Sequence, residues 1–89
     1  MAWAIRFEKA AAKELSKLDR EVARWIVRFL SERVAELDNS REIGEARKGS
    51  SLGEFWKYRV GDYRVICKIV DSEITIVVIR LGNRREVYR

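Results

Sequence analysis

The chain has 89 residues, of which 47% are hydrophobic and 37% charged, and its formal net charge is +5 at pH 7. This composition favours one folded domain over residues 1–89, and the lack of a long apolar run or a signal peptide predicts a cytoplasmic protein with no membrane partner. The absence of histidine and the single cysteine exclude Ser–His or Cys–His catalysis, an internal disulfide and a Cys-rich metal site.

The first half of the chain predicts a short strand followed by two helices. Residues 2–7 alternate, with Trp3, Ile5 and Phe7 on one face. Residues 8–18 are rich in good helix formers, with Ala11, Leu15 and Leu18 on the buried side. Asp19 is a suitable N-cap for a second helix that ends near Leu37 or Asp38, and the absence of a loop predicts an antiparallel helical hairpin. Trp25 lies off the centre of its apolar stripe, and we favour the core over a partner surface for it.

Residues 38–54 predict a long connection, because their periodicity is weak and they contain three of the five glycines. Their charged middle has room for one helical turn. Arg47 and Lys48 come near the end of this segment, where they could flank a charged face of the sheet. The alternative for either residue is an ordinary solvated loop charge.

Residues 55–69 predict a β-hairpin around Gly61-Asp62, a pair that suits a two-residue type II′ turn. With that loop, Val60 pairs with Tyr63 and Arg59 with Arg64. Alternation then puts Trp56, Tyr58, Val60, Tyr63, Val65, Cys67 and Ile69 on one face, where Cys67 is expected to be a small buried hydrophobe. Lys57, Arg59 and Arg64 lie together on the other face.

Like charges placed directly opposite each other destabilise a sheet, so the Lys57/Arg59/Arg64 cluster is either a site for a phosphate or simply a solvated basic face. The charge distribution favours a site. Residues 1–46 carry nine basic and nine acidic side chains, whereas residues 47–89 carry ten and five. Arginine outnumbers lysine 13 to 6, which suits bidentate phosphate binding, and the excess of positive charge attracts nucleic acid or an acidic partner.

The end of the chain predicts one more turn and a central strand. Asp71-Ser72-Glu73 forms the turn, and the β-branched run from Ile74 to Ile79 is typical of a strand covered on both faces. The face on which Arg80 lies is left open. Gly82-Asn83 is expected to turn the chain into a short final strand or tail. The fold class is therefore α+β, in the order β-α-α-β-β-β with a possible further strand, and a helical hairpin packs on one face of a small, mainly antiparallel twisted sheet.

Three features of the sequence point to a known family: this element order, the run Phe-Trp-Lys-Tyr-Arg-Val-Gly-Asp-Tyr-Arg-Val-Ile at residues 55–66, and the closing Gly-Asn-Arg-Arg-Glu-Val-Tyr at 82–88. In these features the chain resembles the RelE/ParE superfamily of bacterial and archaeal toxins, and the RelE branch in particular. The resemblance implies a ribosome-dependent endoribonuclease that needs neither a metal nor another cofactor, cuts mRNA in the A site and inhibits translation. Its implied partners are a cognate antitoxin that wraps the toxin, the 70S ribosome with its A-site mRNA, and operator DNA through the antitoxin complex alone.

The resemblance also implies residue roles. Lys57 corresponds to a phosphate-contacting lysine, Arg59 to the position of a lysine base, Arg64 to the arginine that stabilises the transition state, Arg84 to the proton donor for the leaving group, and Tyr88 to a tyrosine that stacks on the substrate base. We expect RNA or ribosome contacts from a further set of cations, namely Arg47, Lys48, Lys68, Arg80 and Arg85.

Arg59 departs from the family pattern, because a guanidinium cannot act as a base near neutral pH. Either Lys57 takes the proton, or catalysis depends mainly on electrostatic positioning, which is the hypothesis we favour. Two alternative functions remain: a non-nuclease DNA gyrase poison like the ParE branch, and a non-toxic antitoxin-binding module in a repressor complex.

Overall fold

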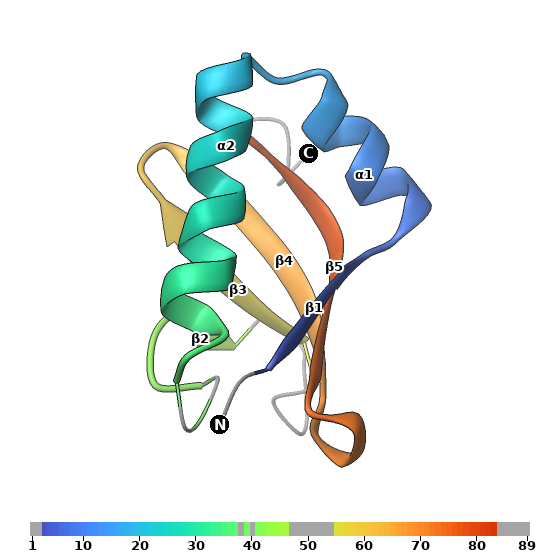
Figure 1. The fold of residues 1–89 in the computed structure, drawn as a ribbon, viewed down its shortest axis with the longest axis vertical. Helices are drawn as coiled ribbons and strands as arrows, with labels where there is room; N and C mark the ends of the chain where they lie inside the picture. Colours follow the sequence, from blue (N-terminus) through green and yellow to red (C-terminus); the bar gives the residue numbers. More distant parts are fainter. Residues whose placement is uncertain (1–2, 38, 40, 47–54, 84–89) are drawn as a thin grey trace.

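Two helices pack on one face of a five-stranded mixed sheet (Figure 1). The computed structural model describes residues 3–37, 39, 41–46 and 55–83. The elements are β1 (Ala4–Phe7), α1 (Lys9–Ser16), α2 (Arg20–Arg28), a π-helical segment (Phe29–Val34), β2 (Glu45–Ala46), β3 (Phe55–Val60), β4 (Tyr63–Val70), a 3₁₀ turn (Asp71–Glu73) and β5 (Thr75–Asn83). The predicted α+β class is confirmed.

The strands lie in the order β1-β5-β4-β3-β2, and β1 runs parallel to β5 while the other neighbours are antiparallel. The predicted strand in the last third is confirmed as interior, because β5 pairs with β1 on one side and with β4 on the other. Ile76, Val77 and Val78 in β5 are all buried. No helix in the described part of the chain is long and apolar enough to cross a membrane.

The hairpin forms with the predicted register. Val60 pairs with Tyr63 and Arg59 with Arg64. Gly61 has a φ of 60° and Asp62 does not have a positive φ, which is the backbone of a type II′ turn. Tyr58 and Cys67 on the core face are fully buried, which confirms the predicted core face. The prediction that the other face is open is wrong for part of the hairpin, because Arg64 and Ile66 on that face are buried as well.

The helices follow the predicted hairpin, with one difference in the second. The Asp19 carboxylate accepts a hydrogen bond from the Glu21 backbone N–H at 2.9 Å, which confirms the N-cap. The α-helix ends at Arg28, and the chain continues as a π-helical segment in which the Ala35 N–H donates to the Leu30 carbonyl at 2.8 Å. The wider turns keep both Leu30 and Val34 in the core.

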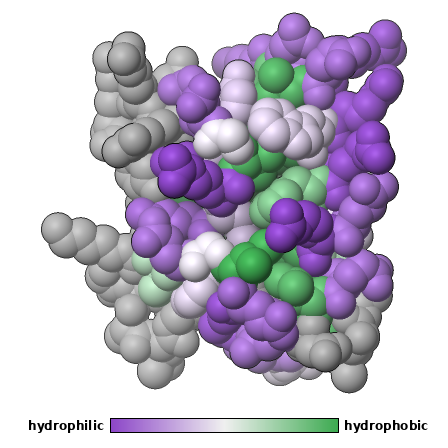
Figure 2. Space-filling view, turned by 90° about the vertical axis from the view of Figure 1, so that its left-hand side faces the viewer, coloured by the Kyte–Doolittle hydropathy of each residue, from purple (hydrophilic) through white to green (hydrophobic). Residues whose placement is uncertain are grey.

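The prediction that Trp25 belongs to the core is wrong. Its side chain is 51% exposed and lies beside the hairpin turn, where a Cβ on Gly61 would come within 2.7 Å of the indole Cη2. Figure 2 shows the side of the molecule that carries α2, and hydrophobic residues run down the middle of this face between hydrophilic ones. Ile26 and Leu30 occupy the side of the helix that faces the sheet, so Trp25 lies outside that contact and covers the end of the hairpin.

Two other predictions about the connections are corrected. Gly82 and Asn83 do not turn the chain, because they continue β5 and pair with Arg64 and Tyr63. The segment after the helices contains the short strand β2 rather than a helical turn in its described part. Glu45 and Ala46 in β2 pair with Lys57 and Trp56, and the Trp56 indole N–H donates to the Ile43 carbonyl at 2.7 Å.

Candidate RNA-binding face

The described strands place six cationic side chains on the face of the sheet opposite the helices, and we call it the cationic face. Side chains that pair directly across neighbouring strands lie on the same face, so the register alone defines this group. Its cations are Arg6, Lys57, Arg59, Arg64, Lys68 and Arg80. The one acidic residue that the described strands add to this face is Glu45, which pairs with Lys57 in the register.

Arg64 is the most unusual of these cations because only 9% of it is exposed. Its guanidinium donates one hydrogen bond to the Tyr63 carbonyl at 3.3 Å, and no carboxylate in the described part of the chain pairs with it. Its neighbour across the hairpin is Arg59, which is exposed. A buried cation beside another cation is costly unless an anion joins them, so this pair is suited to hold a phosphate.

Lys57 is paired with an acid that the sequence analysis did not single out. Its ammonium Nζ lies 3.2 Å from Glu45 Oε1. The short strand β2 brings Glu45 to this place, and Gly44 lets it approach closely: Gly44 has a φ of 83°, and a Cβ there would come within 2.5 Å of the Lys57 carbonyl oxygen. The Glu45 side chain is 72% exposed and is therefore accessible to a ligand on the cationic face.

A β-bulge decides the position of Arg80, which the sequence left open. Ile66 pairs with Arg80 and Cys67 with Val78, so Ile79 is the extra residue. The bulge reverses the alternation and turns Arg80 towards the cationic face. Arg80 lies at the rim, with Nη2 3.4 Å from Glu14 Oε2, while Glu14 Oε1 accepts a hydrogen bond from the Leu81 N–H at 3.2 Å.

Lys68 and Arg6 occupy the other end of the cationic face. Both pair with Val77 in the register, and neither has an ion-pair partner among the described residues. They line a hollow of about 530 Å³ together with Arg41 and Asp71. Arg41 donates two hydrogen bonds to the Asp71 carboxylate, at 2.8 and 3.0 Å, which raise the pKa of Arg41 and lower the pKa of Asp71. Arg6 was not proposed from the sequence, although strand alternation puts its side chain on the face opposite to that of Ile5 and Phe7.

The remaining predicted site residues lie outside the part of the chain that the structure describes. These are Arg47, Lys48, Arg84, Arg85 and Tyr88. Of the ten site residues proposed from the sequence, the structure therefore places five, namely Lys57, Arg59, Arg64, Lys68 and Arg80, and brings all five to the cationic face.

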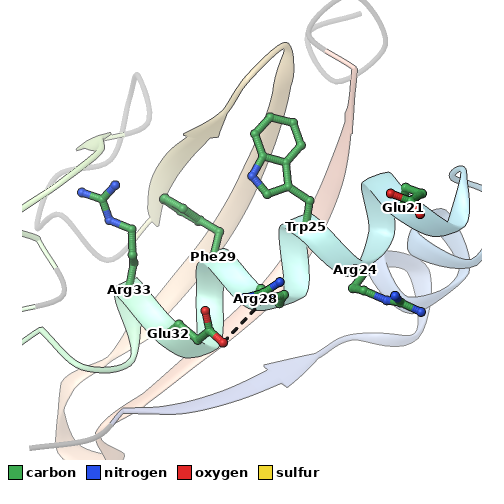
Figure 3. Close-up of a pocket in the computed structure, with 7 residues that line it drawn as sticks. All are labelled: Glu21, Arg24, Trp25, Arg28, Phe29, Glu32 and Arg33. Atoms are coloured by element: carbon green, nitrogen blue, oxygen red, sulfur yellow. Dashed lines mark ion pairs between the residues drawn. The ribbon is translucent and has the colours of Figure 1, made fainter.

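A second hollow, of about 500 Å³, lies on the outer side of α2 and its π-helical extension (Figure 3). Trp25, Phe29 and Arg33 form one row along the helix, and Arg24, Arg28 and Glu32 form the next. The Arg33 guanidinium lies 5.9 Å from the centre of the Phe29 ring, and Arg28 forms an ion pair with Glu32 at 3.6 Å. This hollow offers an aromatic surface bordered by arginines.

Other reactive groups contribute little to the described surface. Cys67 is buried in the core, and desolvation raises the pKa of its thiol, which keeps it protonated and unreactive. Within the described ranges, no group of three His, Cys, Asp or Glu residues is placed to hold a metal ion.

Comparison with known proteins identifies the family. Residues 5–88 match the model of the family described as the ParE toxin of the type II toxin–antitoxin system parDE. The chain belongs to the RelE/ParE family of toxins. The curated toxin RelG of Mycobacterium tuberculosis is 32% identical over 92 aligned positions, which cover 100% of this chain and 99% of RelG.

Solved structures of RelE toxins share the fold of this toxin. A doubly substituted Escherichia coli RelE in the free state is 27% identical, with a TM-score of 0.79, and the match covers 99% of this chain and 92% of RelE. The RelBE2 toxin–antitoxin complex of M. tuberculosis gives a TM-score of 0.81 at 24% identity, covering 94% of this chain and 93% of the matched chain. The family model carries the ParE description while these relatives are RelE and RelG toxins, so the activity has to be argued from the site.

Proposed function

We propose that this toxin is a ribosome-dependent, metal-independent endoribonuclease that cuts mRNA in the A site. The observation that carries the proposal is the nearly buried Arg64 facing Arg59 across the hairpin, with Lys57 on the same face. These cations on a rigid sheet are suited to bind a backbone phosphate and to stabilise the charge that develops on it. The resemblance of residues 55–66 and 82–88 to the RelE branch favours an RNA-directed activity over a gyrase-directed one, and two of the similar proteins are a RelG and a RelE toxin.

The proposed reaction is an internal transfer within the RNA. The 2′-oxygen attacks the adjacent 3′-phosphorus, its proton passes to a base, and the bond from phosphorus to the 5′-oxygen breaks as that oxygen takes up a proton. The products are a 2′,3′-cyclic phosphate and a 5′-hydroxyl. Arg64 stabilises the additional negative charge on the phosphoryl oxygens, and Lys57 and Arg59 hold the phosphate in place. Arg84 as the proton donor and Tyr88 as the stacking residue belong to the same proposal.

The experiment that tests this function uses purified toxin, programmed ribosomes and a defined mRNA. Cuts confined to the A-site codon, with 2′,3′-cyclic-phosphate and 5′-hydroxyl ends, are expected. The same preparation is incubated with DNA gyrase and supercoiled DNA. Gyrase-linked DNA breaks without RNA cleavage would replace the proposal with the ParE-like function. Inactivity in both assays would favour the third function, a non-toxic antitoxin-binding module.

The identity of the base can be tested with two variants, because Arg59 cannot take the proton. Lys57 and Glu45 are the neighbouring groups that have a basic form, and Lys57 Nζ lies 3.2 Å from Glu45 Oε1. If Glu45 is the base, Glu45→Gln should lower the single-turnover rate by about 10²–10⁴-fold, as loss of a general base typically does. Full activity in both Glu45→Gln and Lys57→Ala would show that neither residue takes the proton. It would favour catalysis in which the arginines act alone, by positioning the phosphate.

We also propose that the cognate antitoxin covers the hollow on α2. The Trp25 indole is 51% exposed there, and the bordering Arg24 and Arg33 favour an acidic segment with an apolar anchor. Trp25→Ala is expected to weaken antitoxin binding by at least about 2 kcal/mol, the size of an interface hot spot, as measured by calorimetry. The matched control is Lys13→Ala on α1, which should bind normally. Unchanged affinity of the Trp25 variant would place the antitoxin elsewhere.

A further inference from the structure

One carboxylate holds two consecutive residues at the free edge of β5. The parallel pairing of β1 with β5 ends at Val78, and no described strand lies beside β5 on that side from there to Asn83. Glu14 of α1 takes this place: its Oε1 accepts a hydrogen bond from the Leu81 backbone N–H at 3.2 Å, and its Oε2 lies 3.4 Å from Arg80 Nη2. Glu14 therefore fixes both the backbone next to Arg80 and the end of the Arg80 side chain.

The position of Glu14 in α1 is unfavourable for the helix itself. α1 ends at Ser16, so Glu14 lies in its last turn, where the unpaired carbonyl groups carry a partial negative charge. A cation is favoured there, and the neighbouring Lys13 fits that rule. A carboxylate in the last turn does not stabilise α1, so the contacts with β5 account for Glu14 better than the helix does.

The contact with Glu14 leaves most of the Arg80 guanidinium available. The carboxylate of Glu14 meets its two donors with one oxygen each, and it engages only one nitrogen of Arg80. The described residues supply no other partner for Arg80, and its side chain is 45% exposed. The remaining N–H groups of the guanidinium can therefore donate to a phosphate while Glu14 holds the side chain in place.

Arg80 lies close to the proposed site of reaction. Arg64 pairs with Gly82 and Ile66 with Arg80, so Arg64 and Arg80 are diagonal neighbours on the cationic face, about 7–8 Å apart, and Gly82 adds no side chain between them. Arg80 also lines a hollow of about 820 Å³ in which Glu14 is the only acid among the described lining residues. An RNA strand whose reacting phosphate is bound by Arg64 can therefore place a neighbouring phosphate on Arg80.

We infer that Glu14 is a positioning residue that holds the Arg80 guanidinium ready for an RNA phosphate next to the reacting one. An exposed arginine at a sheet edge has many rotamers, and ordering it during binding lowers the affinity. Glu14 orders Arg80 before the RNA arrives and does not itself touch the RNA. The inference rests on the proposed function, and it adds a residue from the helical layer to the action of the cationic face.

The test measures binding of the full-length toxin, freed of antitoxin, to a short single-stranded 2′-fluoro RNA, which has no attacking hydroxyl and is not cut. Glu14→Asp keeps the charge but is one methylene shorter, so it can no longer reach both donors. It should weaken binding by roughly 2- to 12-fold, the cost of ordering one long side chain, and leave the slope of log affinity against log salt unchanged. Arg80→Gln should weaken binding and also reduce the magnitude of that slope by about 0.7, because it removes a phosphate contact.

A double-mutant cycle shows whether Glu14 acts through Arg80. In the Arg80→Gln background, Glu14→Asp should cause no further loss of affinity, since the side chain that it positions is gone. Glu8→Asp makes the same change at the other end of α1 and is the matched control, which should bind RNA as the wild type does. Wild-type affinity of Glu14→Asp, the same loss in both backgrounds, or no RNA binding by the wild type would overturn the inference.

The two proposals fail in different ways. Normal A-site cleavage by a toxin in which Glu14 and Arg80 act independently would overturn the positioning role and leave the endoribonuclease function intact. Coupling of Glu14 to Arg80 in RNA binding, without cleavage of ribosome-bound mRNA, would support the positioning role and overturn the proposed reaction. Urea unfolding of each variant shows whether a loss of binding comes from loss of folded protein, and a Glu14→Asp loss explained in that way would count against the inference.

Discussion

Replacing Arg64 with alanine is expected to lower the single-turnover rate of mRNA cleavage by about 10²–10³-fold, the usual effect of removing one donor that stabilises a developing oxyanion. The side chain is only 9% exposed, so water screens its interaction with a bound phosphate less than it screens an exposed arginine. The free energy of unfolding should not fall, because the variant also removes a buried cation opposite Arg59.

The rate is measured with toxin in excess over programmed ribosomes, and stability by urea unfolding. Arg59→Ala is the matched control, since it removes the cation across the hairpin whose side chain is exposed, and a smaller loss of rate is expected. Arg64→Lys keeps the charge but loses the planar fork, so its rate should lie between wild type and Arg64→Ala. A variant Arg64→Ala that cleaves normally, or one that is unfolded, would contradict the assignment.

The largest effect on stability is expected from Tyr58→Ala, because Tyr58 is the largest of the fully buried side chains. Its ring contacts Phe29 edge to face, with centroids 6.4 Å apart, and so joins the hairpin to the π-helical segment. Aromatic-to-alanine changes in cores cost about 3–5 kcal/mol, a large part of the 5–15 kcal/mol by which small domains are stable. Each kcal/mol should lower Tm by about 4–8 °C in a domain of this size.

Two controls bracket this prediction. Tyr58→Phe keeps the ring and should cost about 1 kcal/mol, the net value of a typical hydrogen bond. Arg59→Ala changes the next residue, which points to the opposite face and is exposed, and it should alter stability by less than about 0.5 kcal/mol. A loss below about 1 kcal/mol for Tyr58→Ala would mean that the hairpin does not pack on the helices as the structure shows.

Much of the candidate site was predictable because strand alternation is a local property. Once Gly61-Asp62 is taken as the loop, the positions of Lys57, Arg59 and Arg64 on one face follow without any knowledge of the rest of the fold, and the register confirms them. The Asp19 N-cap was predictable for the same reason, since it depends on a side chain and a backbone N–H two residues apart. Arg6 could have been found in the same way.

Residues whose roles depend on distant segments could not be predicted. Glu45 reaches Lys57 because β2 pairs with β3 at the edge of the sheet. A strand of two residues is too short to show a recognisable alternation in the sequence. Trp25 was assigned to the core because helical spacing shows how wide the apolar stripe is, but not how much of it the sheet covers. The π-helical turn after Arg28 changes which side chains face the sheet, and it too has no local signature.

By itself, then, the sequence determined the fold class, the hairpin with its two faces, the helix start and the superfamily resemblance, all of which depend on residues close together in the chain or on the order of elements. The tertiary structure decided the rest of the cationic face. Pairing of β1 with β5 placed Arg6 beside Val77 and Lys68, and the bulge at Ile79 turned Arg80 to the same face. Strand order and a one-residue bulge are set by packing across the whole sheet, so no local pattern encodes them.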